Sequence, residues 1–197
     1  MRPQPSERAL FFRSFLAHPR LVGAVLPTSA RAARAMLDMA DLGRARLVVE
    51  LGAGTGSHTG HVLDRLAPDA RLVAFEIDAA MADTLRAKIA DPRLTVVTGS
   101  AEDVIEVLGG QRPEVVVSAL PFTSLPAGIG HTILERTARV LAPGGTLLVL
   151  QYSPLLAREL SRLFASVTRR VCLPNVPPAF LYACRDPRAP GAPPSTP

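Results

Sequence analysis

Cysteine is scarce in this chain of 197 residues: there are two, Cys172 and Cys184, which lie on predicted strands and form no C-x-x-C pair. Their scarcity excludes a disulfide framework and indicates buried thiols in a reducing compartment. The four histidines also lack the spacing of metal ligands. His58 and His61 stand three residues apart, but two histidines alone are more typical of a surface than of a metal site. We therefore predict no metal.

Long apolar runs are missing as well. The longest, residues 21–27 and 146–150, are far shorter than the about 20 residues that cross a bilayer. The first stretch of the chain is arginine-rich and aromatic, without the cleavage site of a signal peptide. The sequence thus predicts a cytoplasmic protein that is soluble or peripheral on the cytoplasmic face of the membrane.

The chain does contain enough apolar residues, 48%, for one domain with a full-sized core. Its positive charge is unevenly placed. Residues 1–46 hold eight arginines and three acidic residues, a net charge of +5, whereas residues 47–197 hold fourteen basic and fourteen acidic residues. This asymmetry predicts an anionic partner at the N-terminal face, either a membrane surface or a nucleic acid.

The most informative motif is an apolar run at residues 47–51 that enters three alternate glycines, Gly52, Gly54 and Gly56, before a helical pattern. This order predicts the strand, tight turn and helix that open a nucleoside-binding α/β sheet. Glu50 stands two residues before the first glycine. A carboxylate there repels a pyrophosphate and attracts an ammonium group.

S-adenosylmethionine matches this chemistry, because it carries an ammonium, a sulfonium and a carboxylate but no phosphate. The N–H groups of the glycine turn suit its carboxylate, and Glu50 suits its cationic part. Glu76 ends the second apolar strand, where a carboxylate can accept both ribose hydroxyls. Glycines alone are equally compatible with a plain strand-to-helix turn; the two carboxylates favour the cofactor site.

Strands and helices alternate along the chain, which predicts a parallel sheet with helices on both faces. Strands are expected near 47–51, 71–76, 93–98, 114–119, 145–151, 167–173 and 179–184. Helices are expected near 57–67, 79–90, 101–109, 128–141 and 154–165. The last two strands are too close for a crossover helix, so the final strand should be antiparallel.

Three regions follow from this pattern. Residues 1–45 form an N-terminal helical arm of the same domain, 46–185 form the core, and the proline-rich residues 186–197 are expected to be disordered. Within the arm, residues 6–17 predict an amphipathic helix. Two interpretations stay open and are compatible: the helix closes over the cofactor, or it dips into acyl chains while arginines hold lipid phosphates.

These motifs resemble those of class I methyltransferases that use S-adenosylmethionine, and more specifically those of bacterial phospholipid N-methyltransferases. The segments that carry the resemblance are residues 11–16, 18–20, 23–29, 50–56, 75–78, 100–103, 119–126, 141–145 and 175–180. The resemblance implies a Rossmann-like class I fold with a mostly parallel seven-stranded sheet, an antiparallel last strand and N-terminal amphipathic helices. It also implies methylation of phosphatidylethanolamine, in up to three steps, toward phosphatidylcholine.

The resemblance and the motifs together give three sets of expected site residues. The cofactor site is expected to contain Thr28, Ser29, Glu50, Gly52, Ala53, Gly54, Thr55, Gly56, Glu76, Ile77, Ser100, Ala101, Glu102 and Ser118. Substrate contacts are expected from Arg20, Arg31, Arg34, Leu120, Pro121 and Phe122. Contacts with an anionic membrane are expected from Arg8, Phe11, Phe12, Arg13, Phe15 and Leu16.

Several roles stay open at this point. Tyr152, after the fifth strand, is a candidate proton acceptor or a half-buried core residue. Ser100 stands where an acidic residue commonly contacts adenine, so Glu102 or Asp103 can take that role. Thr28 or Ser29 caps the helix that runs toward residue 40.

Two rival functions remain. One is an RNA adenine N6-dimethyltransferase, which shares the Glu-Ile-Asp strand end and a Leu-Pro-aromatic loop. Enzymes that act on exocyclic base amines usually carry Asn or Asp where Ala119 stands, which argues against a nucleobase and predicts no nucleic-acid partner. The other is a non-catalytic, membrane-binding module that keeps the fold.

Overall fold

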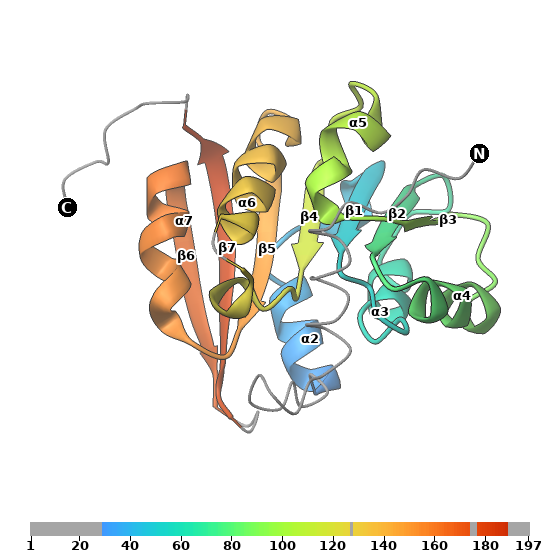
Figure 1. Cartoon of the computed structure of the whole chain (residues 1–197), viewed down its shortest axis with the longest axis horizontal. Helices are drawn as coiled ribbons and strands as arrows, with labels where there is room; N and C mark the ends of the chain where they lie inside the picture. Colours follow the sequence, from blue (N-terminus) through green and yellow to red (C-terminus); the bar gives the residue numbers. More distant parts are fainter. Residues whose placement is uncertain (1–28, 127, 174–176, 189–197) are drawn as a thin grey trace.

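A seven-stranded sheet in the order β3-β2-β1-β4-β5-β7-β6 forms the centre of the molecule (Figure 1). This computed structural model describes residues 29–126, 128–173 and 177–188. The strands are β1 (Leu47–Leu51), β2 (Arg71–Glu76), β3 (Leu94–Thr98), β4 (Val115–Ser118), β5 (Thr146–Gln151), β6 (Phe164–Cys172) and β7 (Ala179–Pro187). Strands β1 to β5 pair in parallel, and β7 pairs antiparallel with both β5 and β6. The predicted α/β sheet with an antiparallel last strand is confirmed.

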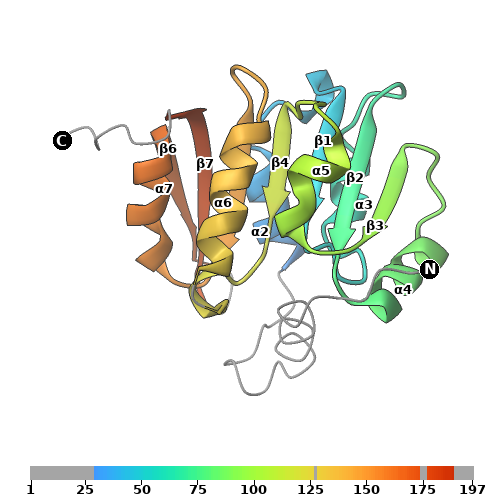
Figure 2. The same ribbon diagram turned by 45° about the horizontal axis from the view of Figure 1, so that its top comes forward.

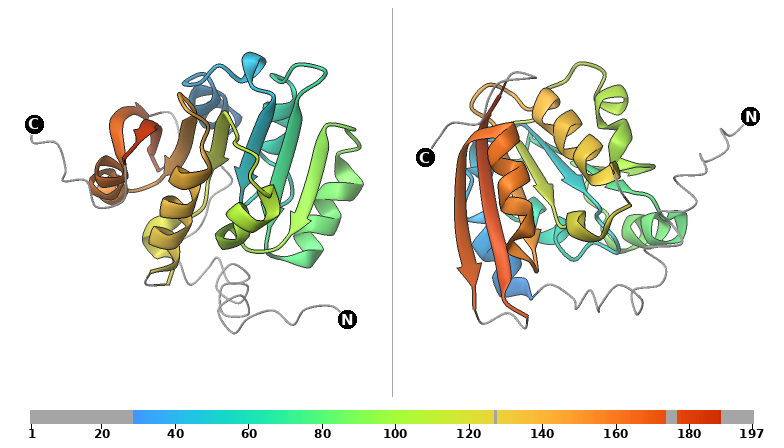
Figure 3. Two further views of the ribbon diagram at one scale, coloured as in Figure 1. Left: turned by 90° about the horizontal axis from the view of Figure 1, so that it is seen from above. Right: turned by 60° about the vertical axis from the view of Figure 1, so that its left-hand side comes forward.

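Helices cover both faces of the sheet, as the alternating pattern predicts (Figures 2 and 3). They are α2 (Ala30–Leu37), α3 (Thr59–Leu63), α4 (Ala79–Lys88), α5 (Val104–Leu108), α6 (Ile129–Val140) and α7 (Ala157–Leu163). Helices α5, α6 and α7 pack on one face, and α2, α3 and α4 pack on the other. Short 3₁₀ segments precede α5 and α7, at Ala101–Asp103 and Pro154–Leu156.

The two cores arise from the alternation of side chains along each strand. Val116 of β4 lies in the core under α5, α6 and α7, whereas its neighbours Val115 and Val117 lie in the core under α2 and α3. Successive residues of a strand point to opposite faces. Both faces are covered, so the central strands are apolar throughout rather than alternately polar.

The helix after the glycine turn is shorter than the sequence pattern predicts. The prediction spans residues 57–67, but α3 covers only Thr59–Leu63. Gly54 and Gly56 have φ angles of 56° and 90°, outside the right-handed helical region. They prolong the turn through His58 and delay the first helical residue.

The C-terminal hairpin is longer than predicted. Strand β6 begins at Phe164, inside the region predicted as helix, because this fully buried side chain pairs with Pro187 and belongs to the core. Strand β7 therefore extends two residues into the segment predicted to be disordered, and the Arg188 N–H donates to the Leu163 carbonyl at 2.8 Å. The rest of that predicted tail lies outside the described residues.

The predicted amphipathic helix at residues 6–17 also lies outside the described residues. The expected membrane contacts Arg8, Phe11, Phe12, Arg13, Phe15 and Leu16, the expected substrate contact Arg20 and the expected cofactor contact Thr28 also lie there. Ser29 is described and caps α2, because its Oγ accepts a hydrogen bond from the Ala32 N–H at 3.2 Å. Helix α2 ends at Leu37 and continues as a turn to residue 40.

Both cysteines are buried and free, as predicted. Burial raises the pKa of Cys184 to about 12, so this thiol stays protonated. Among the residues described, no helix is long and apolar enough to cross a bilayer.

Candidate functional site

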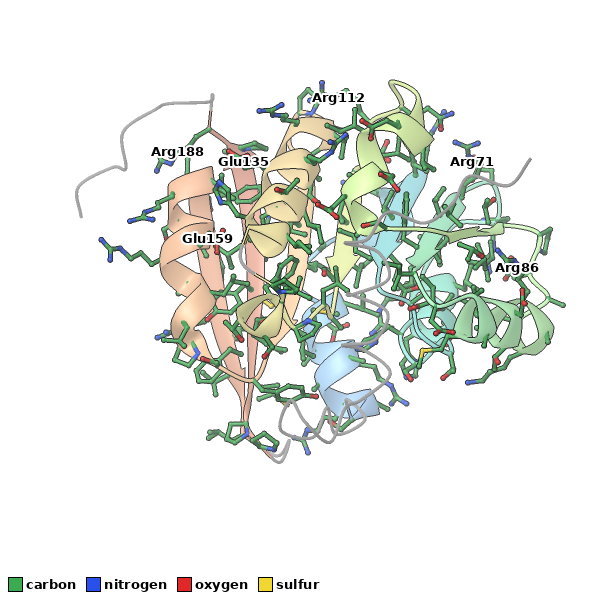
Figure 4. The ribbon with its side chains drawn as sticks, in the orientation of Figure 1. Arg71, Arg86, Arg112, Glu135, Glu159 and Arg188 are labelled. Carbon is green, nitrogen blue, oxygen red and sulfur yellow. The ribbon has the colours of Figure 1, made fainter. Side chains whose placement is uncertain are left out.

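The candidate site lies at the carboxyl end of β1, where the order of strands reverses. Strand β1 has β2 on one side and β4 on the other, so the chain leaves β1 toward opposite halves of the sheet. Loops diverge at such a switch point and leave a crevice outside the strand ends. The charged side chains labelled in Figure 4 lie around the periphery of the molecule, away from this point.

The three glycines of the turn have different reasons to be glycine. All have positive φ, at 78° for Gly52, 56° for Gly54 and 90° for Gly56. A Cβ on Gly52 would lie 2.5 Å from Leu120 Cδ2, and one on Gly56 would lie 2.7 Å from Leu85 Cδ1. A Cβ on Gly54 would meet nothing within 4 Å. Two glycines therefore permit close packing, and the middle one leaves open space over the turn.

The backbone amides of the turn are largely satisfied by the protein itself. The N–H groups of Gly52 and Ala53 donate to the Phe75 carbonyl at 2.9 and 3.0 Å, and that of Gly56 donates to the Ala53 carbonyl at 3.0 Å. The Gly54 N–H donates to Glu76 Oε2 at 2.7 Å. These four amides therefore donate within the protein in this conformation, and the expectation that N–H groups of the glycine turn receive the carboxylate of the cofactor stays a prediction.

Thr55 and Ser118 complete the predicted residues on the two loops. Thr55 is exposed, and its carbonyl accepts a hydrogen bond from Lys88 Nζ at 3.3 Å. Ser118, the last residue of β4, is fully buried, and its Oγ accepts from the Leu120 N–H at 3.3 Å. Both residues shape a loop, and their roles toward the cofactor stay predictions.

Glu50 is a buried carboxylate with one satisfied oxygen. Its side chain is 2% exposed, and Oε2 accepts a hydrogen bond of 2.7 Å from Thr59 Oγ1 on α3. Oε1 is buried without a hydrogen-bond partner. Burial, with a smaller contribution from the charge of Glu76, raises the pKa of Glu50 to about 7. Such an orphaned acceptor is rare and suits a cationic donor from a ligand.

Glu76 is the second buried carboxylate, at the end of β2. It is 3% exposed and accepts hydrogen bonds from the N–H groups of Gly54 and Asp78, at 2.7 and 2.8 Å. Burial raises its pKa, and these hydrogen bonds oppose the rise. A carboxylate has about four acceptor sites, so Glu76 can accept ribose hydroxyls in addition to these two bonds.

A small recess beside Glu76 brings together several residues that the sequence predicts. Including its open mouth it measures about 220 Å³, and it is lined by Gly52, Phe75, Glu76, Ile77, Gly99, Ala101 and Leu120. Ser100 and Glu102 stand next to it without lining it. The Ser100 Oγ accepts from the Glu102 N–H at 3.1 Å, so it caps the following 3₁₀ segment. Their predicted contact with adenine stays a prediction.

The loop after β4 places its residues deeper than expected. Leu120 is 4% exposed and Phe122 is 7% exposed, and both belong to the core that packs under α6. Phe122 thus has a packing role in this core, and its substrate contact stays a prediction. Pro121 is half-buried between them.

Gln151 is a site residue that the sequence reasoning missed. It ends β5, is 3% exposed, and its Nε2 donates to the Leu120 carbonyl at 2.7 Å. This bond holds the β4 loop against the end of β5. The available signal was a single amide at the end of an otherwise apolar strand, where a buried polar group needs a partner.

Tyr152 and the two arginines of α2 lie near the same edge of the sheet. Tyr152 is half-buried and packs against the core formed with α2, as its structural interpretation predicts; its catalytic role stays a prediction. Arg31 and Arg34 are exposed. Neither guanidinium has an ion pair with a residue that the structure describes.

His58 differs from the prediction of a surface histidine. It is 7% exposed, directly before α3, and its Nε2 is buried without a hydrogen-bond partner. Burial, with a smaller effect from His61, lowers the pKa of His58 to about 4. The imidazole is therefore neutral at physiological pH. The glycine turn explains the burial, since it folds residues 57 and 58 back before the helix begins.

Comparison with known proteins identifies related sequences and folds. A family model described as a methyltransferase domain matches residues 48–145. An ornithine lipid N-methyltransferase from Singulisphaera acidiphila is 34% identical over 181 residues, which cover 89% of this chain and 94% of that protein. The ribosomal RNA small subunit methyltransferase A of Cutibacterium acnes is 36% identical over 99 residues, which cover 47% of this chain and 32% of that protein.

A solved structure with a similar fold is that of an N-methyltransferase from Bradyrhizobium japonicum WM9. It superposes with a TM-score of 0.67 at 14% identity, over 80% of this chain and 96% of that chain. At this identity the likeness concerns the fold alone.

The described residues fit S-adenosylmethionine. The unpaired Oε1 of Glu50 suits its ammonium group, and the space over Gly54 admits a ligand close to the backbone. Glu76 borders the recess at a place where it can accept ribose hydroxyls. These residues were predicted from the sequence, and the geometry brings them to one end of the sheet.

Substitution of two glycines separates packing from ligand space. Gly52→Ala should destabilise the protein by about 2 kcal/mol or more, because its Cβ meets Leu120 at positive φ. Gly54→Ala should cost about 1 kcal/mol of stability, yet weaken S-adenosylmethionine binding strongly by filling the open space. Chemical denaturation and calorimetric titration measure the two effects. Unchanged binding by Gly54→Ala would contradict this assignment.

Glu50→Gln tests the carboxylate. Because the pKa of Glu50 is about 7 in the free protein, it must lose a proton to pair with an ammonium group. Affinity for S-adenosylmethionine should therefore fall as pH drops from about 7 to about 5.5, a window about one unit or more below the ordinary pKa of an α-ammonium group, in which the ligand stays mostly charged. Glu50→Gln should bind more weakly and lose this pH dependence. Calorimetric titration at several pH values checks it; an equally steep dependence in the variant would refute it.

Gln151→Leu tests the anchor of the β4 loop. The change leaves the buried Leu120 carbonyl without its donor, so it should lower the free energy of unfolding by about 1–3 kcal/mol and weaken cofactor binding. Gln111→Leu is the control, since Gln111 is exposed and remote from the site. Equal urea-denaturation curves for the two variants would show that the anchor is unimportant.

Proposed function

Since the chain belongs to the class I S-adenosylmethionine-dependent methyltransferases, in the family of the ornithine lipid N-methyltransferase, we propose that it methylates the amine of a membrane lipid. S-adenosylmethionine is its methyl donor. The proposed substrates are phosphatidylethanolamine and its mono- and dimethyl forms, toward phosphatidylcholine. The single observation that carries the proposal is the 34% identity to a lipid N-methyltransferase over 94% of that protein.

Ornithine lipid is the second candidate substrate, because it is the substrate that the relative's name states. Both lipids present an aliphatic amine at the membrane surface, so both pose the same chemical problem. The amine must be neutral to attack, and with a pKa near ~10 only about one in a thousand is neutral at pH 7. Removing the amine from water favours the neutral form.

The chain's own residues support this reaction by positioning and by excluding water. When bound, S-adenosylmethionine supplies an activated methyl group for an in-line displacement, in which alignment dominates the rate. Leu120 lines the recess next to the glycine turn, and the half-buried Pro121 beside it is a proposed further apolar contact for the substrate. Tyr152, at the end of β5, is the proposed group that orients the amine or accepts its proton. Arg31 and Arg34 are the proposed contacts for a lipid phosphate.

The proposal places the enzyme on the cytoplasmic face of the membrane as a peripheral protein. The net charge of +5 in residues 1–46 supports attraction to anionic lipids. A nucleic-acid substrate is disfavoured by Ala119, which offers no side-chain hydrogen bond to a base amine. The likeness to the ribosomal RNA methyltransferase, moreover, covers only 32% of that protein.

A transfer assay tests the function directly. The protein is incubated with methyl-labelled S-adenosylmethionine and one of three acceptors: phosphatidylethanolamine vesicles, ornithine lipid vesicles or ribosomal RNA. Label should enter phosphatidylethanolamine and yield mono-, di- and trimethyl products, and Glu50→Gln should reduce it at least about tenfold. Label in ornithine lipid alone would reassign the substrate. Label in RNA alone, or binding of S-adenosylmethionine without any transfer, would refute lipid methylation.

A further inference from the structure

Large exposed apolar side chains are few in the part of the chain that the structure describes, and most are gathered in one place. They are Leu155 (77% exposed), Leu173 (72%), Val171 (45%) and Val107 (44%). A single exposed aliphatic residue needs no explanation, but a group of them marks an interaction surface. Three of the four belong to one end of the sheet, as its topology shows.

The topology places Leu155, Val171 and Leu173 at the carboxyl edge of the parallel strands. Leu155 follows the end of β5 by four residues. Gln151, the last residue of β5, pairs with Phe180 near the start of β7, and Cys172 at the end of β6 pairs with Ala179, so these strand ends lie at this same edge. Val171 and Leu173 stand on either side of the last residue of β6. Figure 1 shows the end of β6 and the start of β7 at the end of the sheet toward which β4 points.

Val107 has the opposite position. Helix α5 leaves the carboxyl end of β3 and leads back to the start of β4, and Val107 is in its last turn. It therefore lies toward the amino edge of the sheet, away from the glycine turn. This gives a residue of the same type and exposure for comparison with Val171.

Arginines accompany the apolar side chains at the carboxyl edge. Arg170 is exposed on β6 and pairs with Leu181, whose side chain belongs to the core shared with α2. Arg31 and Arg34 are exposed on α2, which packs against the same end of the hairpin through that core. No acidic residue occurs in residues 29–37, 152–158, 168–173 or 177–180. These segments therefore carry a net positive charge; Asp38, directly after the first, is paired with Arg65, and Glu159, directly after the second, contacts His131.

We infer that these residues form a docking surface for an anionic lipid bilayer, separate from the N-terminal arm. This hairpin rim consists of Leu155, Val171 and Leu173 with Arg31, Arg34 and Arg170. The aliphatic side chains enter the interfacial layer, and the arginines hold lipid phosphates around them. The inference rests on the proposed lipid substrate, and it implies that the carboxyl edge of the sheet, with the candidate site, faces the bilayer.

A bilayer explains the composition of the hairpin rim better than a nucleic acid does. Arginines alone suit either polyanion. Proteins that hold single strands combine basic residues with aromatic stacking platforms, whereas Leu155, Val171 and Leu173 are aliphatic and offer no ring to a base. Aliphatic side chains next to arginines are the combination that a lipid interface requires.

Vesicle sedimentation of the full-length chain tests the inference, with equimolar phosphatidylcholine and phosphatidylglycerol and no S-adenosylmethionine. The double variant Leu155→Ser/Leu173→Ser should bind about tenfold more weakly than the wild type. The affinity of Arg170→Glu for these vesicles should fall about tenfold, whereas its affinity for pure phosphatidylcholine vesicles should change little. Calorimetric titration with S-adenosylmethionine should show unchanged affinity in each variant, which establishes that the fold and cofactor site are intact.

Matched substitutions at the opposite edge are the controls. Val107→Ser and Arg139→Glu change exposed residues near the amino ends of the strands and should leave vesicle binding within roughly twofold of the wild type. The inference is overturned if the hairpin-rim variants bind vesicles as tightly as the wild type, or if the control variants lose as much vesicle affinity as they do. It is also overturned if the hairpin-rim variants lose affinity for RNA and not for vesicles.

Binding is measured without methyl transfer, so the two proposals fail separately. Selective loss of vesicle binding in the hairpin-rim variants supports the docking surface even if no lipid becomes methylated, and in that case only the proposed function falls. If the wild type methylates lipid but the hairpin-rim variants bind vesicles as well as it does, the docking surface is refuted and the proposed function stands.

Discussion

Two carboxylates buried side by side at the ends of β1 and β2 are the constraint on which the site depends. Placing ionisable groups in a low-dielectric interior is unfavourable unless hydrogen bonds or opposite charges compensate it. Thr59 compensates one oxygen of Glu50, and backbone N–H groups of Gly54 and Asp78 compensate Glu76. The remaining oxygen of Glu50 has no hydrogen-bond partner among the residues that the structure describes. A cationic ligand would supply the missing donor, so this oxygen is suited to bind a ligand rather than another residue.

The turn that presents these carboxylates is held by packing across three strands. Gly52 can approach Leu120 because it lacks a Cβ, and the Leu120 carbonyl is fixed by Gln151 at the end of β5. The β1 turn, the β4 loop and the end of β5 therefore form one connected unit. A change in any of the three contacts shifts the others, because close-packed interiors transmit displacement rather than absorb it.

The sequence was most informative where local patterns determine the outcome. Apolar runs located every strand, and the glycines with Glu50 and Glu76 located the site. What could not be predicted depended on contacts distant in sequence. Phe122 is buried because α6 covers the loop. The Gln151 side chain finds its acceptor, the Leu120 carbonyl, only because β5 lies beside β4 in the sheet. The Gly54 amide is occupied because the Glu76 side chain accepts its hydrogen bond across 22 residues, which no one-dimensional pattern shows.

The buried carboxylates also bear on how an amine could react at this edge. Uncompensated negative charge near the site would hold a substrate amine in its protonated, unreactive form. Pairing Glu50 with the ammonium of the methyl donor cancels much of that charge and leaves the sulfonium as the dominant neighbour, which favours the neutral amine. In the proposed function, the ammonium group of S-adenosylmethionine therefore neutralises Glu50 before the lipid amine attacks the methyl group. A dedicated general base then becomes less necessary, which agrees with Tyr152 being the only candidate that the sequence suggested for that role.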